Sequence, residues 1–178
     1  MLGLLLESLI KSPLTEQAPA PEDRALGELA DAMSRAARRH LGRSLAIREV
    51  DAGSCNGCEL EIHALNNPYY DVERFGLRFV ASPRHADVLL VTGPVTKNMK
   101  EALERTYRAT PDPKWVVALG DCAIDSGCFT GSYAILGPVS AVIPVDLRIP
   151  GCPPSPSAIL RALLALLEHG RLRSSANP

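Results

Sequence analysis

Cys55 and Cys58 are separated by two residues in the run G-S-C-N-G-C-E-L-E, residues 53–61. Two thiols at this spacing can bind one metal centre or act as a redox-active dithiol. An apolar run, residues 44–50, ends just before them and a helical pattern follows, so we expect a strand to end and a helix to begin here. The N–H groups of that first helical turn favour a bound anion or thiolate. By itself the motif is compatible with half of a zinc site, half of an iron–sulfur site, a thioredoxin-like redox pair or no site at all.

Short apolar runs alternate with helical patterns after residue 45. Runs such as V-L-L-V and W-V-V-A-L are uninterrupted by polar residues, which is typical of strands buried on both faces. With intervening helices they predict a mostly parallel α/β sheet that has helices on both faces. The expected strands are Leu45–Val50, Leu77–Val80, Val88–Val91, Trp115–Leu119 and Val142–Ile149, and the expected helices are Glu59–Leu65, Thr96–Tyr107 and Ser157–Glu168.

Four cysteines are expected at one edge of this sheet, because ligands of open α/β sheets gather at the carboxyl ends of the strands. Cys55 and Cys58 follow the first strand, Cys122 follows W-V-V-A-L-G-D, and Cys152 follows the last strand in I-P-G-C-P-P. Cysteines scattered through a core would not fall past strand ends three times, so we interpret the four as one ligand set. Cys128, six residues after Cys122 in a loop rich in Gly and Ser, is assigned as a non-ligand.

The spacing of these cysteines favours an iron–sulfur cluster over zinc. A structural zinc site is usually built from two compact knuckles, because local chelation folds the small module. Here Cys122 follows Cys58 by 64 residues, and Cys152 follows Cys122 by 30. A [4Fe–4S] cluster needs one thiolate per iron and can take them from a preformed scaffold. We therefore expect one [4Fe–4S] cluster, with nearby glycines allowing close approach of the main chain.

Composition limits the classes of function. The 178 residues are 46% hydrophobic and 22% charged, which suits one globular domain with a short extension. A formal net charge of −1 and an aromatic content of 4% argue against nucleic acid as a partner. Five unevenly spaced cysteines favour a reducing compartment over a disulfide framework.

An amphipathic helix is expected over Glu22–Leu41, with four arginines on its polar side. A proline-rich linker, residues 12–21, and a short apolar segment, residues 1–10, precede it. The apolar segment is too short to span a bilayer and suits docking on a partner, on a membrane surface or on the chain's own core. We expect three parts: an N-terminal extension (1–45), an α/β domain (46–170) and a C-terminal tail (171–178).

Four ordered motifs carry a resemblance to a known family. The runs D-A-G-S-C-N-G-C-E-L-E-I, S-P-R-H-A-D-V-L-L-V-T-G-P-V-T, A-L-G-D-C-A-I-D-S-G and R-I-P-G-C-P-P-S-P resemble the small iron–sulfur subunit shared by respiratory complex I, where it is the 20 kDa subunit, and energy-converting [NiFe] hydrogenases. The likeness covers roughly residues 46–167. It implies a flavodoxin-like domain that binds one [4Fe–4S] cluster, and the positions matching the family's ligands are Cys55, Cys58, Cys122 and Cys152.

Two departures from the family pattern are informative. Complex I members carry two adjacent cysteines in the first motif, whereas this chain has C-N-G-C, which looks most like membrane-bound hydrogenases of the formate hydrogenlyase type. Cys128 stands where the family usually has Gly. The resemblance implies a cluster proximal to a [NiFe] site, partnership with a large subunit, a ferredoxin-like iron–sulfur subunit and membrane subunits, and a peripheral location on the cytoplasmic side of the inner membrane.

The chain itself lacks a nucleophile with its base, a phosphate-binding loop and a nickel site, so we expect an electron-transfer subunit of an oxidoreductase without turnover of its own. A complex I-like subunit that passes electrons to quinone is the alternative within this class. A flavodoxin-like FMN-binding protein is an alternative of another class, although the first strand–helix turn lacks a phosphate cradle. A thioredoxin-like dithiol enzyme is a further alternative.

Glu59 directly follows the second thiol. A carboxylate beside an anionic cluster could serve as a proton relay, or it could be a helix-start carboxylate that the helix dipole favours.

Overall fold

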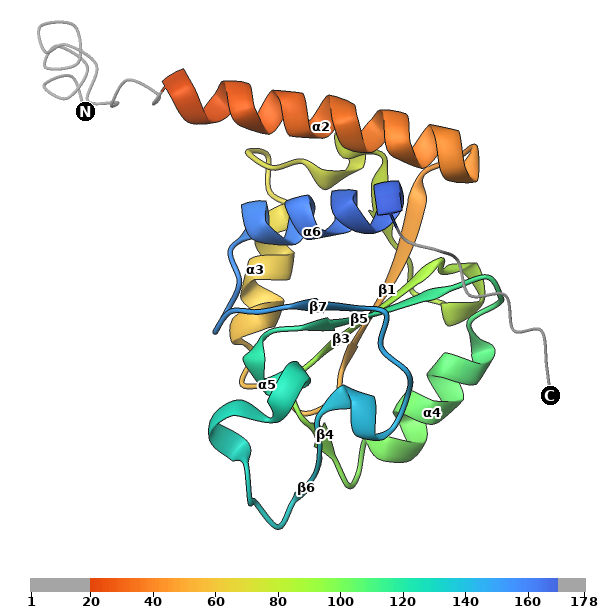
Figure 1. Cartoon of the computed structure of the whole chain (residues 1–178), viewed down its shortest axis with the longest axis vertical. Coiled ribbons are helices and arrows are strands. Elements are labelled where there is room, and N and C mark those ends of the chain that lie inside the picture. Colours follow the sequence, from red (N-terminus) through yellow and green to blue (C-terminus); the bar gives the residue numbers. More distant parts are fainter. Residues whose placement is uncertain (1–19, 170–178) are drawn as a thin grey trace, which may run out of the picture.

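The sheet at the centre of the fold has five parallel strands. The computed structural model describes residues 20–169, and within this range the strand order is β2-β1-β3-β5-β7 (Figure 1). The strands are β1 (Leu45–Asp51), β2 (Leu77–Phe79), β3 (Val88–Thr92), β5 (Trp115–Leu119) and β7 (Leu147–Ile149). A separate antiparallel pair joins β4 (Val95–Thr96) to β6 (Ile135–Gly137).

Strand β3 shows why the central strands carry uninterrupted apolar runs. Val88 and Leu90 enter one hydrophobic cluster, whereas Leu89 and Val91 enter another on the opposite face. All residues of β3 and β5 are buried. A strand with a core on each side has no solvent face for polar residues, and the mostly parallel α/β fold expected from the sequence is confirmed.

Helices cover both faces of this sheet (Figure 1). They are α2 (Ala20–Leu41), α3 (Gly57–Leu65), α4 (Lys100–Ala109), α5 (Asp121–Asp125) and α6 (Pro156–His169), with single 3₁₀ turns η1 (Val72–Phe75), η2 (Pro83–His85), η3 (Gly127–Phe129) and η4 (Val139–Ala141). The core on one face contains buried residues of α2, α3 and α6, and the core on the other contains buried residues of α4 and α5.

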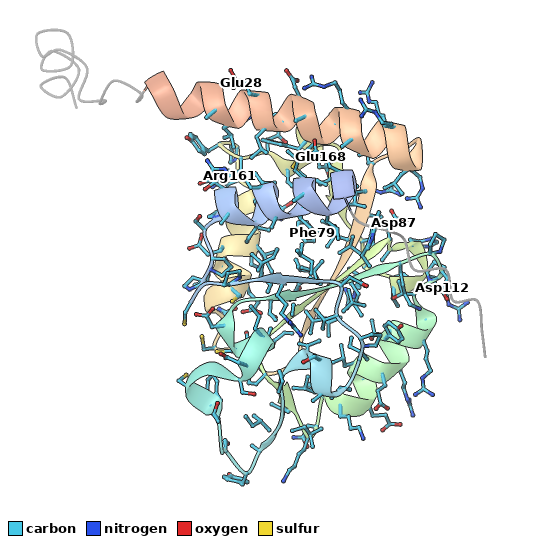
Figure 2. All side chains as sticks on the ribbon, viewed as in Figure 1. Glu28, Phe79, Asp87, Asp112, Arg161 and Glu168 are labelled. Carbon is cyan, nitrogen blue, oxygen red and sulfur yellow. The ribbon has the colours of Figure 1, made fainter. Side chains whose placement is uncertain are left out.

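The amphipathic helix α2 packs alongside α6 (Figure 1). Its apolar face, including the fully buried Met33, belongs to the same cluster as the sheet. Just after α2, Arg43 donates two hydrogen bonds to the carboxylate of Asp87, at 2.9 and 2.6 Å. Asp87, labelled in Figure 2, also accepts the N–H of Ala46 at 2.9 Å. These bonds fix the end of α2 to the amino edge of the sheet.

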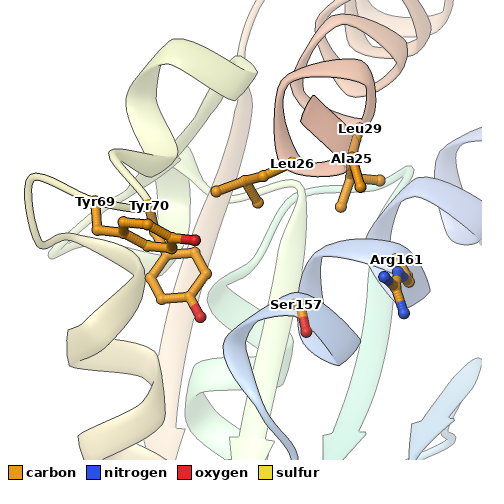
Figure 3. A pocket seen from close by; sticks show the side chains of 7 residues that line it. All are labelled: Ala25, Leu26, Leu29, Tyr69, Tyr70, Ser157 and Arg161. Atoms are coloured by element: carbon orange, nitrogen blue, oxygen red, sulfur yellow. The ribbon is translucent and has the colours of Figure 1, made fainter. Parts of the chain in front are cut away.

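A small pocket of about 150 Å³ lies where the start of α2 faces α6 (Figure 3). Leu26 and Leu29 of α2, Tyr69 and Tyr70 after α3, and Arg161 of α6 line it. The two tyrosine rings meet edge to face, with centroids 4.9 Å apart. The pocket therefore marks the joint between the N-terminal helix and the α/β layers.

The prediction of a strand over residues 142–149 is wrong for the first half of that range. Only Leu147–Ile149 forms a strand, because the N–H groups of Val142 and Ile143 both bond back to the carbonyl of Val139, each at 3.0 Å, in the turn η4. Local hydrogen bonding within four residues thus removes an apolar run from the sheet.

The expected helix over residues 96–107 begins later, at Lys100, because Thr96 pairs with Ile135 in the β4–β6 ladder. The expected linker, residues 12–21, overlaps α2, which already begins at Ala20. Its earlier part and the apolar segment 1–10 lie outside the described residues. Within residues 20–169, none of the helices has the length and apolar character needed to cross a membrane.

Candidate metal centre

The first thiol pair lies in a tight turn between β1 and α3. Asp51, the last residue of β1, accepts hydrogen bonds from the N–H groups of Gly53 and Ser54, each at 2.7 Å. An Asp side chain that bonds the backbone two residues ahead is a common means of closing such a turn. The turn leaves Cys55 exposed and Cys58 half-buried at the start of α3.

The loops that carry the other two thiols are bonded to each other. The N–H of Asp121 donates to the carbonyl of Gly151 at 2.9 Å, and the N–H of Gly151 donates to Asp121 Oδ1 at 2.8 Å. Cys122 follows Asp121 directly, and Cys152 follows Gly151. The reciprocal bonds therefore bring the loop after β5 and the loop after β7 to one place at the carboxyl edge of the sheet.

Glycines let these loops approach the first thiol pair. A Cβ on Gly120 would lie 2.6 Å from Cys58 Sγ and 3.4 Å from the carbonyl oxygen of Gly151. A Cβ on Gly57 would lie 3.9 Å from Pro153 Cδ. The loop after β5 therefore passes Cys58 more closely than any residue with a Cβ would allow at Gly120, while Gly57 and Pro153 are at ordinary contact distance.

The thiols act on one another electrostatically. Burial raises the pKa of Cys58 from 9.0 to about 12, and negative charge on Glu59, Cys122, Cys55 and Cys152 adds to the shift. Figure 2 shows several sulfur atoms at this edge, beside α5. The four cysteines that the sequence pattern selected thus lie within one electrostatic neighbourhood, and without a cation the thiol form of Cys58 is favoured.

This donor set fits an iron–sulfur cluster. Four thiols contributed by three loops match the one thiolate per iron that a [4Fe–4S] cluster requires. Among residues 20–169, no group of three or more His, Cys, Asp or Glu side chains converges closely enough to hold a single metal ion. Thiolates bound to separate irons stand around a cluster and do not converge on one point. Iron cations would also favour the thiolate form of Cys58, whose pKa is raised first by burial and then by nearby negative charge.

Cys128 is exposed and lies in the turn η3. Burial raises the pKa of Cys122, and among the charges that add to this shift Cys128 comes first, followed by Cys152 and Cys55. The fifth cysteine is therefore a close neighbour of one proposed ligand, and its assignment as a non-ligand stays a prediction.

Glu59 is 9% exposed and accepts a hydrogen bond from Ser54 Oγ at 2.6 Å. Its other oxygen, Oε1, has no hydrogen-bonding partner within the part of the chain that the structure describes. Together with Glu49 and His63 it lines a cavity of about 190 Å³ next to α3. The Glu59 side chain therefore borders a cavity, and its role in proton relay stays a prediction.

Two carboxylates that shape the site were missed by the sequence reasoning. Asp51 closes the first thiol turn, and Asp121 joins the last two loops. The sequence did contain a signal for Asp51. An Asp at a strand end with Gly two residues later is typical of a turn in which the Asp side chain accepts backbone N–H groups. The bond from Asp121 crosses 30 residues of sequence, so no local pattern could have revealed it.

Fold and site together define a class, an α/β protein that gathers four cysteines from three loops at the carboxyl edge of a parallel sheet. Residues 55–166 match the family described as NADH ubiquinone oxidoreductase, 20 Kd subunit. The chain belongs to this family, which confirms the resemblance drawn from the sequence motifs.

Relatives within the family are subunits of hydrogenase complexes by name. The chain is 49% identical over 130 residues to the probable membrane-bound hydrogenase subunit mbhJ of Pyrococcus furiosus, covering 73% of this chain and 78% of that protein. It is 42% identical over 152 residues to formate hydrogenlyase subunit 7 of Escherichia coli, covering 84% of this chain and 60% of that protein.

Solved structures agree with the fold. A chain of the membrane-bound sulfane sulfur reductase, an archaeal respiratory membrane complex, aligns with a TM-score of 0.63 and 35% identity, over 79% of this chain and 78% of that one. A chain of the NAD⁺-reducing [NiFe]-hydrogenase in the H₂-reduced state aligns with a TM-score of 0.55 and 20% identity, over 75% of this chain and 97% of that one. The second likeness concerns the fold alone.

Proposed function

We propose that this chain is the electron-transfer subunit of a membrane-bound, hydrogenase-type complex and that it holds one [4Fe–4S] cluster. The observation that carries the proposal is the meeting of three cysteine-bearing loops at one sheet edge, with Gly120 against Cys58 and Asp121 bonded to Gly151. When bound, the cluster supplies one-electron oxidation and reduction. The ligands proposed are Cys55, Cys58, Cys122 and Cys152.

The residues of this chain have three tasks in that function. The thiols bind the irons, and the half-buried position of Cys58 and Cys122 keeps water away from one side of the site. The bonds of Asp51 and Asp121 hold the ligand loops in place before metal is bound, so less ordering is needed on binding. Burial and hydrogen bonds to the sulfurs set the potential at which the electron is held.

Two exposed thiols and two exposed apolar side chains suit contact with a partner. Cys55 and Cys152 are exposed, and so are the apolar side chains of Leu60 on α3 and Tyr133 before β6, at 61% and 90%. Electron transfer needs centres close together, so a partner's redox centre must approach this edge. We assign the edge to a [NiFe]-type large subunit, and further surfaces to a ferredoxin-like subunit and to membrane subunits on the cytoplasmic side of the membrane.

Hydrogenase-type partnership is favoured over the complex I-like alternative by two observations. The first thiol motif is C-N-G-C, and relatives at 49% and 42% identity carry hydrogenase and formate hydrogenlyase names. The likeness at 35% identity to a sulfane sulfur reductase chain favours a second candidate, in which the same electron-transfer role serves a complex of the sulfane sulfur reductase type.

Metal analysis of the native complex tests the proposal. After anaerobic purification, we expect about four irons and matching acid-labile sulfide attributable to this subunit, lost on Cys152→Ser substitution, with nickel in a larger copurifying chain. Iron without nickel would favour a subunit of a sulfur-reductase or complex I-like complex over a hydrogenase subunit. Zinc without iron would contradict the metal assignment, and a flavin absorption band from this subunit would favour the FMN-binding alternative.

A further inference from the structure

The hydroxyl of Ser54 forms a bridge at the start of α3. It accepts a hydrogen bond from the N–H of Asn56 at 3.0 Å and donates one to Oε2 of Glu59 at 2.6 Å. Asn56 directly precedes the helix, and its own side chain makes no capping hydrogen bond. In an ordinary capping box, a Glu in the first turn would itself accept the N–H of the residue before the helix. Here the Ser54 hydroxyl stands between these two groups.

The backbone of Ser54 is held on two further sides. Its N–H donates to Asp51 Oδ1 at 2.7 Å, at the end of β1. A Cβ on Gly93, the residue after β3, would lie 2.4 Å from the nitrogen of Ser54 and 2.6 Å from its Cα. Ser54 is therefore fixed against the ends of two neighbouring strands, and its hydroxyl joins that fixed point to α3.

The first thiol pair lies within the span that this bridge closes. Cys55 stands between Ser54 and Asn56, and Cys58 directly precedes Glu59. Asn56 has a φ of 70°, a left-handed conformation that is uncommon for residues other than Gly. The bond to the N–H of Asn56 restrains the turn that carries Cys55, and the bond to Glu59 restrains the helical turn that carries Cys58. One side-chain oxygen thus links the positions of both thiols.

The burial of Glu59 increases the effect of losing this bridge. The side chain is 9% exposed, and its Oε1 has no hydrogen-bonding partner in the part of the chain that the structure describes. Without the Ser54 hydroxyl, the buried carboxylate would lose the donor to Oε2 as well. A buried charged group that loses a hydrogen bond is destabilised more than an exposed pair.

We propose that Ser54 is a positioning residue that fixes Cys55 and Cys58 relative to each other for binding one iron–sulfur cluster. The inference rests on the proposed function. Thiols that are already held in place need less ordering when the irons bind, so the irons bind more tightly. The hydroxyl acts through the turn and through Glu59, and it needs no contact with the cluster itself.

The test measures the rate at which an iron chelator, bathophenanthroline disulfonate, removes iron from the anaerobically purified complex. Ser54→Ala should release the iron of this subunit at least roughly tenfold faster than wild type, as expected for a lost hydrogen bond to a charged group. Ser54→Thr keeps the hydroxyl and should stay near the wild-type rate. The matched control is Ser132→Ala, because the Ser132 hydroxyl also accepts the N–H two residues ahead, at 3.4 Å, but on an exposed turn.

A second pair of variants tests the bridge from its other end, and it also decides the matter if Ser54→Ala does not fold. Glu59→Gln keeps an acceptor for the Ser54 hydroxyl and should release iron at nearly the wild-type rate. Glu59→Leu removes the acceptor and should release iron as fast as Ser54→Ala.

Electron–nuclear double resonance of the reduced cluster separates positioning from general stability. Couplings to the β-protons of the ligating cysteines depend on the orientation of each Cβ–H bond, so they should change in Ser54→Ala and remain in Ser54→Thr. Wild-type release rates and couplings in Ser54→Ala, or equal damage in Ser54→Ala and Ser54→Thr, would overturn the proposal. Failure of the proposed function is distinguishable, since the wild-type complex would then lack any iron signal that Cys152→Ser removes.

Discussion

Gly120 lies so close to Cys58 that a methyl group on its Cα would come within 2.6 Å of Cys58 Sγ. Gly120 also has φ 87° and ψ 156°, a conformation that is open essentially to glycine alone. The end of β5 and the start of α3 are therefore fitted to each other at the sulfur of one proposed ligand. No single stretch of sequence contains this relationship, because the two residues are 62 positions apart.

Gly120→Ala should lose most of its iron, because Cys58 Sγ cannot both bind iron and move away from the added methyl group. Backbone strain adds about 1–3 kcal/mol of destabilisation. Gly131→Ala is the matched control, since Gly131 has a similar φ of 83° but open space within 4 Å of its Cβ position. Iron per copy in the two purified complexes is the measurement. Equal iron in both variants would mean that the contact with Cys58 does not matter.

Cys58 in the iron-free protein should react slowly with iodoacetamide at neutral pH, because a thiol with a pKa of about 12 forms little thiolate. The exposed Cys55 should react faster. Since burial is the main cause of the shift, the two rates should converge in denaturant, which serves as the control. Tandem mass spectrometry of the alkylated peptide gives both rates. Because iron must displace the proton, cluster uptake should also weaken as pH falls.

Asp87→Asn should destabilise the fold by about 1 to 3 kcal/mol, because the buried carboxylate accepts two bonds from Arg43 and one from Ala46. Glu101→Gln is the control, since Glu101 pairs with Arg105 on the exposed face of α4 and its loss should cost less than about 0.5 kcal/mol. Chemical unfolding of the purified subunit measures both. Equal losses would show that Asp87 does not anchor the end of α2.

Glu49→Gln should stabilise the protein at neutral pH and have little effect in acid. Burial, with the carboxylates of Glu59 and Asp51, raises the pKa of Glu49 above its ordinary value. A raised folded-state pKa gives stability that is present below the unfolded pKa and lost as pH rises through the folded pKa. Gln keeps the neutral form throughout. Thermal unfolding of both proteins across this pH range is the measurement, and a gain that does not grow with pH would contradict the assignment.

Local patterns were sufficient for the parallel sheet, and they selected the four cysteines whose role as ligands stays a prediction. The runs at residues 88–91 and 115–119 predicted strands buried on both faces, and the structure has them as β3 and β5 within the sheet. Strand ends in turn located the thiols, because parallel strands share a carboxyl edge.

Two kinds of feature could not be predicted in this way: a local turn that replaces part of an expected strand, and contacts between residues far apart in the sequence. The apolar residues Val142 and Ile143 looked like part of a strand, yet they bond locally to Val139. The short pair β4–β6 joins residues about 40 positions apart and carries no periodic signal. The clamp between Asp121 and Gly151 belongs to the same class, since it exists only once β5 and β7 are neighbours.

The most direct test of the central claim is EPR of the dithionite-reduced native complex, comparing wild type with Cys152→Ser and with Cys128→Ser as the matched thiol control. We expect Cys152→Ser to abolish the signal of one [4Fe–4S] cluster together with about four irons per copy, while Cys128→Ser retains both. An unchanged spectrum and iron content in Cys152→Ser would contradict the claim that the cysteines of this sheet edge hold a cluster.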